Sequence, residues 1–139
     1  MLRITITFLF IILSSCVYAY DLAIVGVYRD ADCSISIKVH NLSDKRIPHK
    51  IFDNIRIKIY GEVVCRNRNT MDYKKSIKLN DFFMLPKYMS TVDTGLYINT
   101  EGNCKTNLKA ELLYKDKMLD DDDLTNNIFS KNLTGPCSY

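Results

Sequence analysis

The amino-acid sequence predicts an all-β protein with the Greek-key architecture of a β-sandwich. Apolar residues recur at every second position in several short segments, and polar clusters rich in Asn, Asp and Lys separate these segments. Such alternation is typical of a strand with one face in a core and the other in water. No segment of useful length has the helical period. About seven short strands at nearly regular spacing therefore predict two packed sheets.

Three strands are expected in the first half of the chain, at 21–28, 33–40 and 55–65. In the second of them, isoleucine and valine alternate with serine, lysine and histidine, so one face is apolar and the other polar. Residues 41–50 are expected to form a loop, because Pro48 prevents regular pairing there.

The following segments are less regular. Residues 66–75 are polar and are expected to form a turn, before a short fourth strand at Ile77 and Leu79. Residues 80–88 are expected to form one helical turn or a bulged crossing between strands. The apolar side chains of this segment that we expect to close one end of the core are Phe82, Phe83 and Leu85.

The last three strands are expected at 92–98, 108–114 and 128–133, each with alternating apolar positions. A turn at 101–103 precedes the second of these strands. An acidic loop connects it to the last strand, which we expect to begin at the paired asparagines 126–127.

Residues 1–19 have the pattern of an export signal. Arg3 supplies a positive charge, 4–13 is an apolar run, and 14–19 contains mostly small residues. A transmembrane helix requires about 20 apolar residues, which is longer than this run. The sequence therefore predicts an exported protein without a membrane span.

Two cleavage sites compete within this signal. Cleavage after Ala19, which we favour from the length of the segment before it, leaves residues 20–139 as a single domain that is secreted or periplasmic. The alternative is a bacterial lipobox at 13–16, in which Cys16 carries a lipid and anchors the protein at a membrane or cell surface.

Four cysteines remain after the signal, and an even number in an exported chain predicts two disulfides. A zinc site with four thiolates normally contains closely spaced cysteine pairs. Each cysteine here is more than thirty residues from the next, so we expect disulfides. The four are Cys33, Cys65, Cys104 and Cys137.

Three short motifs carry a resemblance to a known family. Residues 21–24 (DLAI) resemble the D-L-x-[VI] start of the CARDB-type, immunoglobulin-like modules of bacterial exported proteins. Residues 39–41 (VHN) are similar to the end of the second strand of that family, and 123–127 (DLTNN) to its acidic entry into the last strand. The resemblance implies a seven-stranded immunoglobulin-like sandwich that serves as a surface or binding module and has no common catalytic residues.

The same resemblance implies a disulfide pairing. In an immunoglobulin-like order the third strand lies antiparallel beside the sixth, which brings Cys65 next to Cys104. The second strand begins and the seventh ends at that same end, which brings Cys33 toward Cys137. A pairing of Cys33 with Cys104 stays open as an alternative.

A run of four carboxylates follows the sixth strand. Clustered carboxylates suit a hard cation such as calcium, but a calcium-binding loop usually also needs a glycine, and none occurs between Gly102 and Gly135. Like-charge runs more often mark a solvated loop, so we expect no metal and no cofactor. The weak candidate ligands are Asp120, Asp121, Asp122 and Asp123.

No catalytic residues are expected. His40 falls on the outward face of its strand and His49 lies in a loop, while the cysteines are assigned to disulfides, so neither histidine has a nucleophile at a plausible spacing. Asn126 and Asn127 are expected to bond their own backbone as in an Asx-turn.

Basic residues cluster around the third strand and the segment after it, close to Tyr60 and Tyr73. They are Arg56, Lys58, Arg66, Arg68, Lys74 and Lys75. We favour the solvent-exposed face of an ordinary antiparallel sheet, with a basic contact face as the alternative. The net charge is +3, of which Arg3 in the signal contributes one, so composition by itself predicts neither a nucleic-acid nor an anionic-membrane partner.

These observations favour a non-enzymatic exported binding or adhesion module that contacts a protein or a glycan through its loops or an exposed sheet face. One alternative is a small secreted inhibitor of a hydrolase, with residues 66–75 as the inhibitory loop. Another is a cation-stabilised structural domain, which depends on the run of aspartates alone.

Overall fold

The protein is an all-β sandwich, as the sequence predicts. The computed structural model describes residues 20–66, 70–115, 117–118 and 124–137. Its strands are β1 (Leu22–Arg29), β2 (Ser34–Asn41), β3 (Ile55–Cys65), β4 (Thr70–Lys78), β5 (Met89–Tyr97), β6 (Thr100–Tyr114), β7 (Lys117–Met118) and β8 (Ile128–Gly135). Its helices are α1 (His49–Phe52) and the single 3-10 turns η1 (Asp81–Met84) and η2 (Leu124–Asn127).

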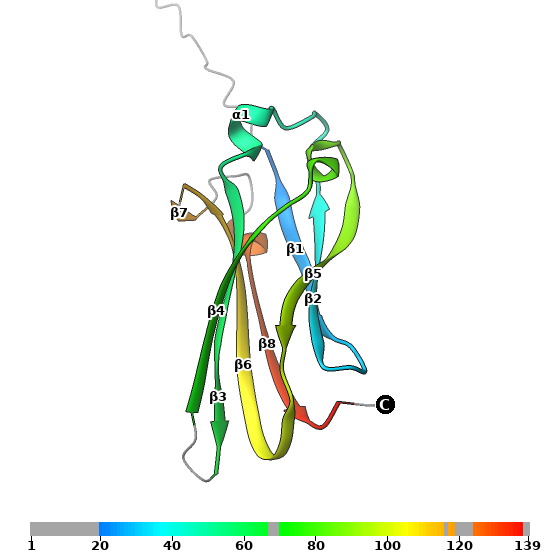
Figure 1. The fold of residues 1–139 in the computed structure, drawn as a ribbon. Coiled ribbons are helices and arrows are strands. Elements are labelled where there is room, and N and C mark those ends of the chain that lie inside the picture. Colours follow the sequence, from blue (N-terminus) through cyan, green and yellow to red (C-terminus); the bar gives the residue numbers. More distant parts are fainter. Residues whose placement is uncertain (1–19, 67–69, 116, 119–123, 138–139) are drawn as a thin grey trace, which may run out of the picture.

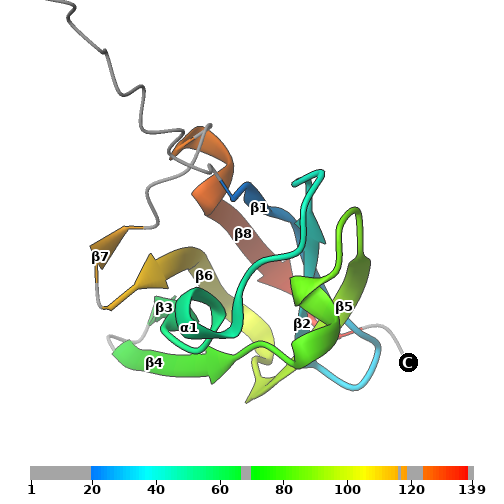
Figure 2. The same cartoon turned by 90° about the horizontal axis from the view of Figure 1, so that it is seen from above.

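Two antiparallel sheets face each other across the core (Figure 1). The first has the strand order β1-β2-β5, and the second has the order β4-β3-β6, with both β7 and β8 paired to β6. The third strand therefore lies between the fourth and the sixth, which is an immunoglobulin-like Greek-key order. Figure 2, viewed along the strands, shows the two sheets as separate layers with α1 over one end.

The core consists of the inward-facing residues of both sheets. Ile35, Ile37 and Val39 of β2 are fully buried, and so are Ile57 and Ile59 of β3. Because successive side chains of a strand point to opposite faces, these buried positions direct the residues between them to the outer surfaces. The alternation read from the sequence is thus the alternation of burial in the fold, except at Ser36 of β2, which is buried as well.

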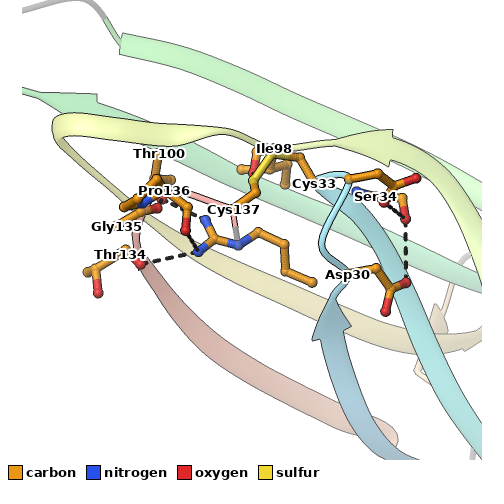
Figure 3. Close-up of a disulfide and its surroundings, with 11 residues drawn as sticks. Asp30, Cys33, Ser34, Ile98, Thr100, Thr134, Gly135, Pro136 and Cys137 are labelled. Atoms are coloured by element: carbon orange, nitrogen blue, oxygen red, sulfur yellow. Dashed lines mark hydrogen bonds between the residues drawn. A yellow bond between two sulfur atoms is a disulfide. The ribbon is translucent and has the colours of Figure 1, made fainter. Parts of the chain in front are cut away.

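Both disulfides lie at the end of the sandwich that is opposite α1. Cys65 and Cys104 are direct neighbours across β3 and β6, with their Cα atoms 4.0 Å apart. Cys33, at the start of β2, is bonded to Cys137, beyond the end of β8, which links the two sheets covalently (Figure 3). These are the two pairs that the family resemblance implied.

Several local expectations were wrong. β4 already begins at Thr70, so 70–75 is strand and not part of a turn. β6 begins at Thr100, so the expected turn at 101–103 lies within a long strand. Residues 70–75 join the sheet because their backbone pairs with β3, which overrides their turn-like composition. Residues 101–103 lie at an irregularity of β6, between the pairs that Thr100 and Lys105 make with β8.

The expected loop at 41–50 contains the start of α1. The amides of Ile51 and Phe52 donate to the carbonyl oxygen of Pro48, and the Phe52 side chain is buried. Pro48, with φ of −64°, occupies the N-cap position, where its missing N–H costs nothing. The proline that excluded a strand therefore begins a short helix.

The 80–88 segment forms the expected helical turn, η1, but two of its three expected core residues are exposed. Phe83 is fully buried, whereas Phe82 is 62% exposed and Leu85 is 39% exposed. Met84 takes a buried position instead. A 3-10 turn has three residues per turn, so its side chains point in three directions. Phe83 and Met84 take the two directions that face the core, and Phe82 takes the third, toward solvent.

Asn41, at the end of β2, positions this turn. Its side chain is fully buried, and its Nδ2 donates to the carbonyl oxygens of Phe83 and Leu85, each at 2.9 Å. Its Oδ1 accepts from the amide of Ser43 at 3.0 Å. One side chain therefore connects β2, the following loop and η1.

We expect Asn41→Ala to lower the free energy of unfolding by about 2–3 kcal/mol, because buried backbone groups lose their partners. Urea denaturation measures the loss, and His40→Ala, at the adjacent half-exposed position, is the control. Equal stability of the two variants would contradict this role of Asn41.

We also expect a mild reductant to open Cys65–Cys104 before Cys33–Cys137. Cys33 and Cys137 are only 7% and 6% exposed, whereas the other two sulfurs are half-buried and thus accessible to a thiolate. Alkylation during partial reduction, followed by peptide mass mapping, identifies the order. Earlier labelling of Cys33 or Cys137 would contradict it.

Candidate functional site

The outer face of the five-stranded sheet brings together basic residues from three strands. Tyr60, on the central strand β3, lies opposite Lys74 of β4 and Lys109 of β6. Lys58, two residues earlier on the same face, lies opposite Glu111 of β6. Directly opposed residues in an antiparallel sheet are near neighbours, so three lysines stand around one tyrosine. We call Lys58, Lys74 and Lys109, with Tyr60 at their centre, the basic face.

Tyr60 is held in place by one contact at its hydroxyl and another on the face of its ring. Its hydroxyl donates to Oε1 of Glu111 at 2.5 Å, and Nζ of Lys58 lies 5.0 Å from the ring centroid. The hydrogen bond to Glu111, with a smaller contribution from burial, raises the pKa of Tyr60 to about 12. Tyr60 therefore stays a neutral hydrogen-bond donor near pH 7, and it keeps the Lys58 ammonium close to the sheet surface.

Other cations of this sheet are engaged nearby. Arg56 donates to the carbonyl oxygens of Asp53 and Ile55, and Lys78 pairs with Asp53 at 3.3 Å. None of the three lysines of the basic face forms an ion pair with another described residue. Their charge is thus available to a ligand.

Two shallow hollows flank Tyr60 and share Lys74. One of about 550 Å³ is lined by Lys58, Lys74, Lys75, Ser76 and Leu113. The other, of about 470 Å³, is lined by Tyr60, Gly61, Glu62, Asp72, Tyr73, Lys74, Asn107 and Lys109. Gly61 is required there because a Cβ would lie 2.5 Å from the carbonyl oxygen of Asn107. The basic face therefore has a shallow hollow on each side of Tyr60.

The structure separates the basic residues that the sequence grouped together. Lys58 and Lys74 belong to the basic face, while Lys75 points from β4 toward Gly95 of β5, where a Cβ would lie 2.5 Å from its Nζ. Arg66 is exposed in the turn after β3, and Arg68 lies outside the described residues.

Tyr73 also departs from the expected cluster, because it turns inward and its hydroxyl bonds with that of Thr106. Burial raises the pKa of Tyr73.

Sequence analysis missed Lys109, which is far from the other lysines along the chain. A signal for it existed, because the inward positions Leu108, Ala110 and Leu112 direct residues 109 and 111 outward. Its partners, however, follow from strand order and register, which only the fold supplies.

A different hollow, of about 740 Å³, lies on the outer face of the three-stranded sheet. Its lining residues are Tyr28, Arg29, Asp30, Ser34, Ser36, Lys38, Thr91 and Asp93. Asp30 accepts hydrogen bonds from the hydroxyls of Ser34 and Ser36. The guanidinium of Arg29 donates to Thr100 and to two carbonyl oxygens of the C-terminal segment beside Cys137. Two carboxylates balance two cations here, so the hollow favours neither charge sign.

The remaining predicted site residues do not form a cluster in the described residues. Asp120 to Asp123 lie outside these residues, and no group of three potential metal ligands occurs within them. His40 is half-exposed on β2, and His49 is exposed on α1.

The paired asparagines form the last turn before β8, in η2. Asn126 donates from Nδ2 to Oδ1 of Asp21 at 2.9 Å, so it joins the start of β1 to η2. Asn127 is fully buried. These positions agree with a structural role, although the bond made by Asn126 reaches another strand and not its own backbone.

The expected inhibitory loop is shorter than the sequence suggested. Residues 70–75 belong to β4, and β3 extends to Cys65, so the connection between the two strands consists of 66–69 only.

Comparisons with known proteins place the chain in no family: no family model matches it, and no curated protein or solved structure does so either. The resemblance to CARDB-type modules therefore stays a prediction. Within the described residues, no helix is long and apolar enough to cross a membrane.

The raised pKa of Tyr60 is open to direct measurement. We expect one phenol to ionise near pH 12 in a spectrophotometric titration, and we expect Tyr60→Phe to remove it. Since the folded-state value exceeds the ordinary value near 10, the stabilisation by neutral Tyr60 is present below about pH 10 and lost as pH rises toward 12. Glu111→Gln lowers this pKa toward its ordinary value. A Tyr60→Phe variant that loses a phenol titrating near pH 10 would contradict the assignment.

Proposed function

We propose that this protein is an exported, non-enzymatic binding module that holds a glycan bearing acidic groups on its basic face. The observation that carries the proposal is the convergence of Lys58, Lys74 and Lys109 around a fixed Tyr60. The three lysines come from three adjacent strands of one sheet, so the backbone ladder sets the spacing of their Cα atoms. Little conformational entropy is then lost in the backbone when a ligand binds.

The chemistry of the face fits acidic groups. Lysine ammonium groups bind carboxylate and sulfate oxygens as point charges. The Tyr60 ring keeps one of these groups, the ammonium of Lys58, close to the sheet surface. The two hollows beside Tyr60 suit sugar units that lie along the sheet, since a glycan is thin and presents many hydroxyls. Ser76 and Asn107 supply hydrogen-bonding groups in these hollows.

The extent of the basic region favours a short acidic segment over a long polyanion. Glu62 lies opposite Asp72 and Asn107 in the next row of the sheet, so two carboxylates border the basic face on one side. A nucleic acid would need a longer unbroken basic track, because its affinity depends on many phosphate contacts.

The arrangement of reactive side chains supports binding over catalysis. All four cysteines of the described chain are in disulfides, and His40 and His49 lie on separate elements. In the described residues, neither histidine lies in the hollows beside Tyr60. The basic face therefore offers charge and hydrogen bonds but no nucleophile with a base.

The test is binding to a soluble acidic polysaccharide, such as polygalacturonate or alginate, measured by calorimetry, with neutral dextran as the control ligand. We expect Lys74→Gln/Lys109→Gln to weaken binding at least about tenfold, since each lost charge pair contributes on the order of 1 kcal/mol. Binding is also expected to weaken as ionic strength rises.

Arg46→Gln/Lys50→Gln is the matched control, because it removes the same number of charges from the exposed loop and helix at one end. We expect this variant to bind like the unmodified protein. Equal weakening in both double variants, or equal binding of dextran and the acidic polymers, would overturn the proposal.

A further inference from the structure

The end of the sandwich that carries η1 exposes three large apolar side chains. Phe82 is 62% exposed, Met89 is 47% exposed and Leu85 is 39% exposed. The ring of Phe82 lies 5.9 Å from that of Tyr88, which in turn packs edge-on against buried Phe83. Phe82 lies in η1, Leu85 directly follows it, and Met89 begins β5; we call these three residues the apolar tip. Exposed groups of this kind mark interaction surfaces more often than isolated apolar residues do.

The apolar tip is rigidly supported. The Asn80 side chain accepts from the amide of Phe82, and Asn41 binds the carbonyl oxygens of Phe83 and Leu85. Phe83 and Met84 are fully buried beneath it. These contacts hold Phe82 and Leu85 toward solvent, although burial of such apolar side chains would stabilise the fold.

Cations surround the apolar tip. A hollow of about 540 Å³ beside Phe82 and Leu85 is also lined by two cations, Arg46 and Lys78, and by one carboxylate, Asp81. Lys87 lies two residues beyond Leu85, pairs with Asp44 at 2.8 Å and donates to the carbonyl oxygen of Leu42. Apolar side chains flanked by lysine and arginine are typical of surfaces that insert into the interface of an anionic bilayer.

The carboxylates of the described residues near the apolar tip are Asp44, Asp53 and Asp81, and Asp21 lies beside Leu42 at the same end. Asp44 and Asp53 are in exposed ion pairs with Lys87 and Lys78. Exposed pairs contribute little to stability, so a lipid phosphate can replace the carboxylate on either lysine.

The chain enters the fold at this same end. The carbonyl oxygen of Asp21 accepts from the amide of Leu42, and the adjacent amide of Asn41 donates to the carbonyl oxygen of Tyr88. The start of β1 is therefore close to the connection from η1 to β5 (Figure 1). Cys16, the alternative lipidation site, precedes Asp21 by five residues, which span at most about 18 Å. A lipid at Cys16 would bring this end of the sandwich to a membrane.

We propose that the apolar tip docks on an anionic membrane surface, with Phe82 and Leu85 inserted at the interface and the neighbouring cations on lipid headgroups. This interaction is separate from the basic face, which lies along the side of the sandwich and remains exposed when one end rests on a membrane. It does not require the lipid, although a lipid at Cys16 would strengthen it, since stable anchoring usually takes two signals.

The experiment uses the full chain, exported through its own signal and carrying Cys16→Ser so that no lipid is attached. The protein is sedimented with vesicles of phosphatidylethanolamine and phosphatidylglycerol, or with vesicles of phosphatidylcholine alone. We expect binding to the anionic vesicles, at least tenfold weaker binding to the neutral ones, and at least tenfold weaker binding of Phe82→Ser/Leu85→Ser.

Met71→Ser/Tyr97→Ser is the matched control. These side chains are 67% and 69% exposed and lie toward the disulfide end, so we expect this variant to bind vesicles like the unmodified protein. Lys74→Gln/Lys109→Gln should lose glycan binding and keep vesicle binding. The two proposals therefore fail independently of each other.

A tryptophan provides a second readout, because the chain contains none. We expect the fluorescence of Phe82→Trp to shift to shorter wavelength with anionic vesicles, and that of Tyr97→Trp to stay unchanged. Vesicle binding that the serine substitutions do not weaken, an unshifted Phe82→Trp, or no binding at all would overturn the proposal. Apolar-tip binding to a soluble protein without binding to vesicles would overturn it as well.

Discussion

The antiparallel pairing of β3 with β6 is the constraint on which the rest of this structure depends. The two strands run side by side from Ile55 opposite Tyr114 to Cys65 opposite Cys104. Their inward residues, such as Ile57 and Leu112, are fully buried. Because strand side chains alternate in direction, burying this set assigns Lys58, Tyr60, Lys109 and Glu111 to the outer surface in one register. The core and the basic face are thus two consequences of one pairing.

The two ends of the sandwich are closed by different chemistry. At one end, two disulfides join β3 to β6 and the start of β2 to the residue after Pro136. At the other end, the buried Asn41 side chain connects β2 to η1 by hydrogen bonds. The first end is constrained by covalent bonds, whereas the second is formed by a loop and the turn η1. At this second end Phe82 and Leu85 are exposed to solvent. A module anchored there would leave its flat side available.

The sequence predicted the burial pattern well and the boundaries less well. The alternation in β2, β3 and β6 was readable because side-chain direction in a strand depends only on position along that strand. Polar strands such as the first half of β4 were missed, because their pairing depends on a neighbouring strand. The exposure of Phe82 was missed for a related reason: composition marked it as core, but the 3-10 turn leaves room for only Phe83 and Met84 beneath it.

By itself, the sequence determined the all-β class and the inward and outward faces of most strands. These properties are local, since hydrophobic burial acts on alternate positions of each segment. Only the tertiary structure decided that Lys58, Lys74 and Lys109 meet around Tyr60 and that Phe82 and Leu85 stand in solvent near the start of β1. These groupings join segments far apart in the chain, so they depend on strand order, register and packing between loops, which no local pattern specifies.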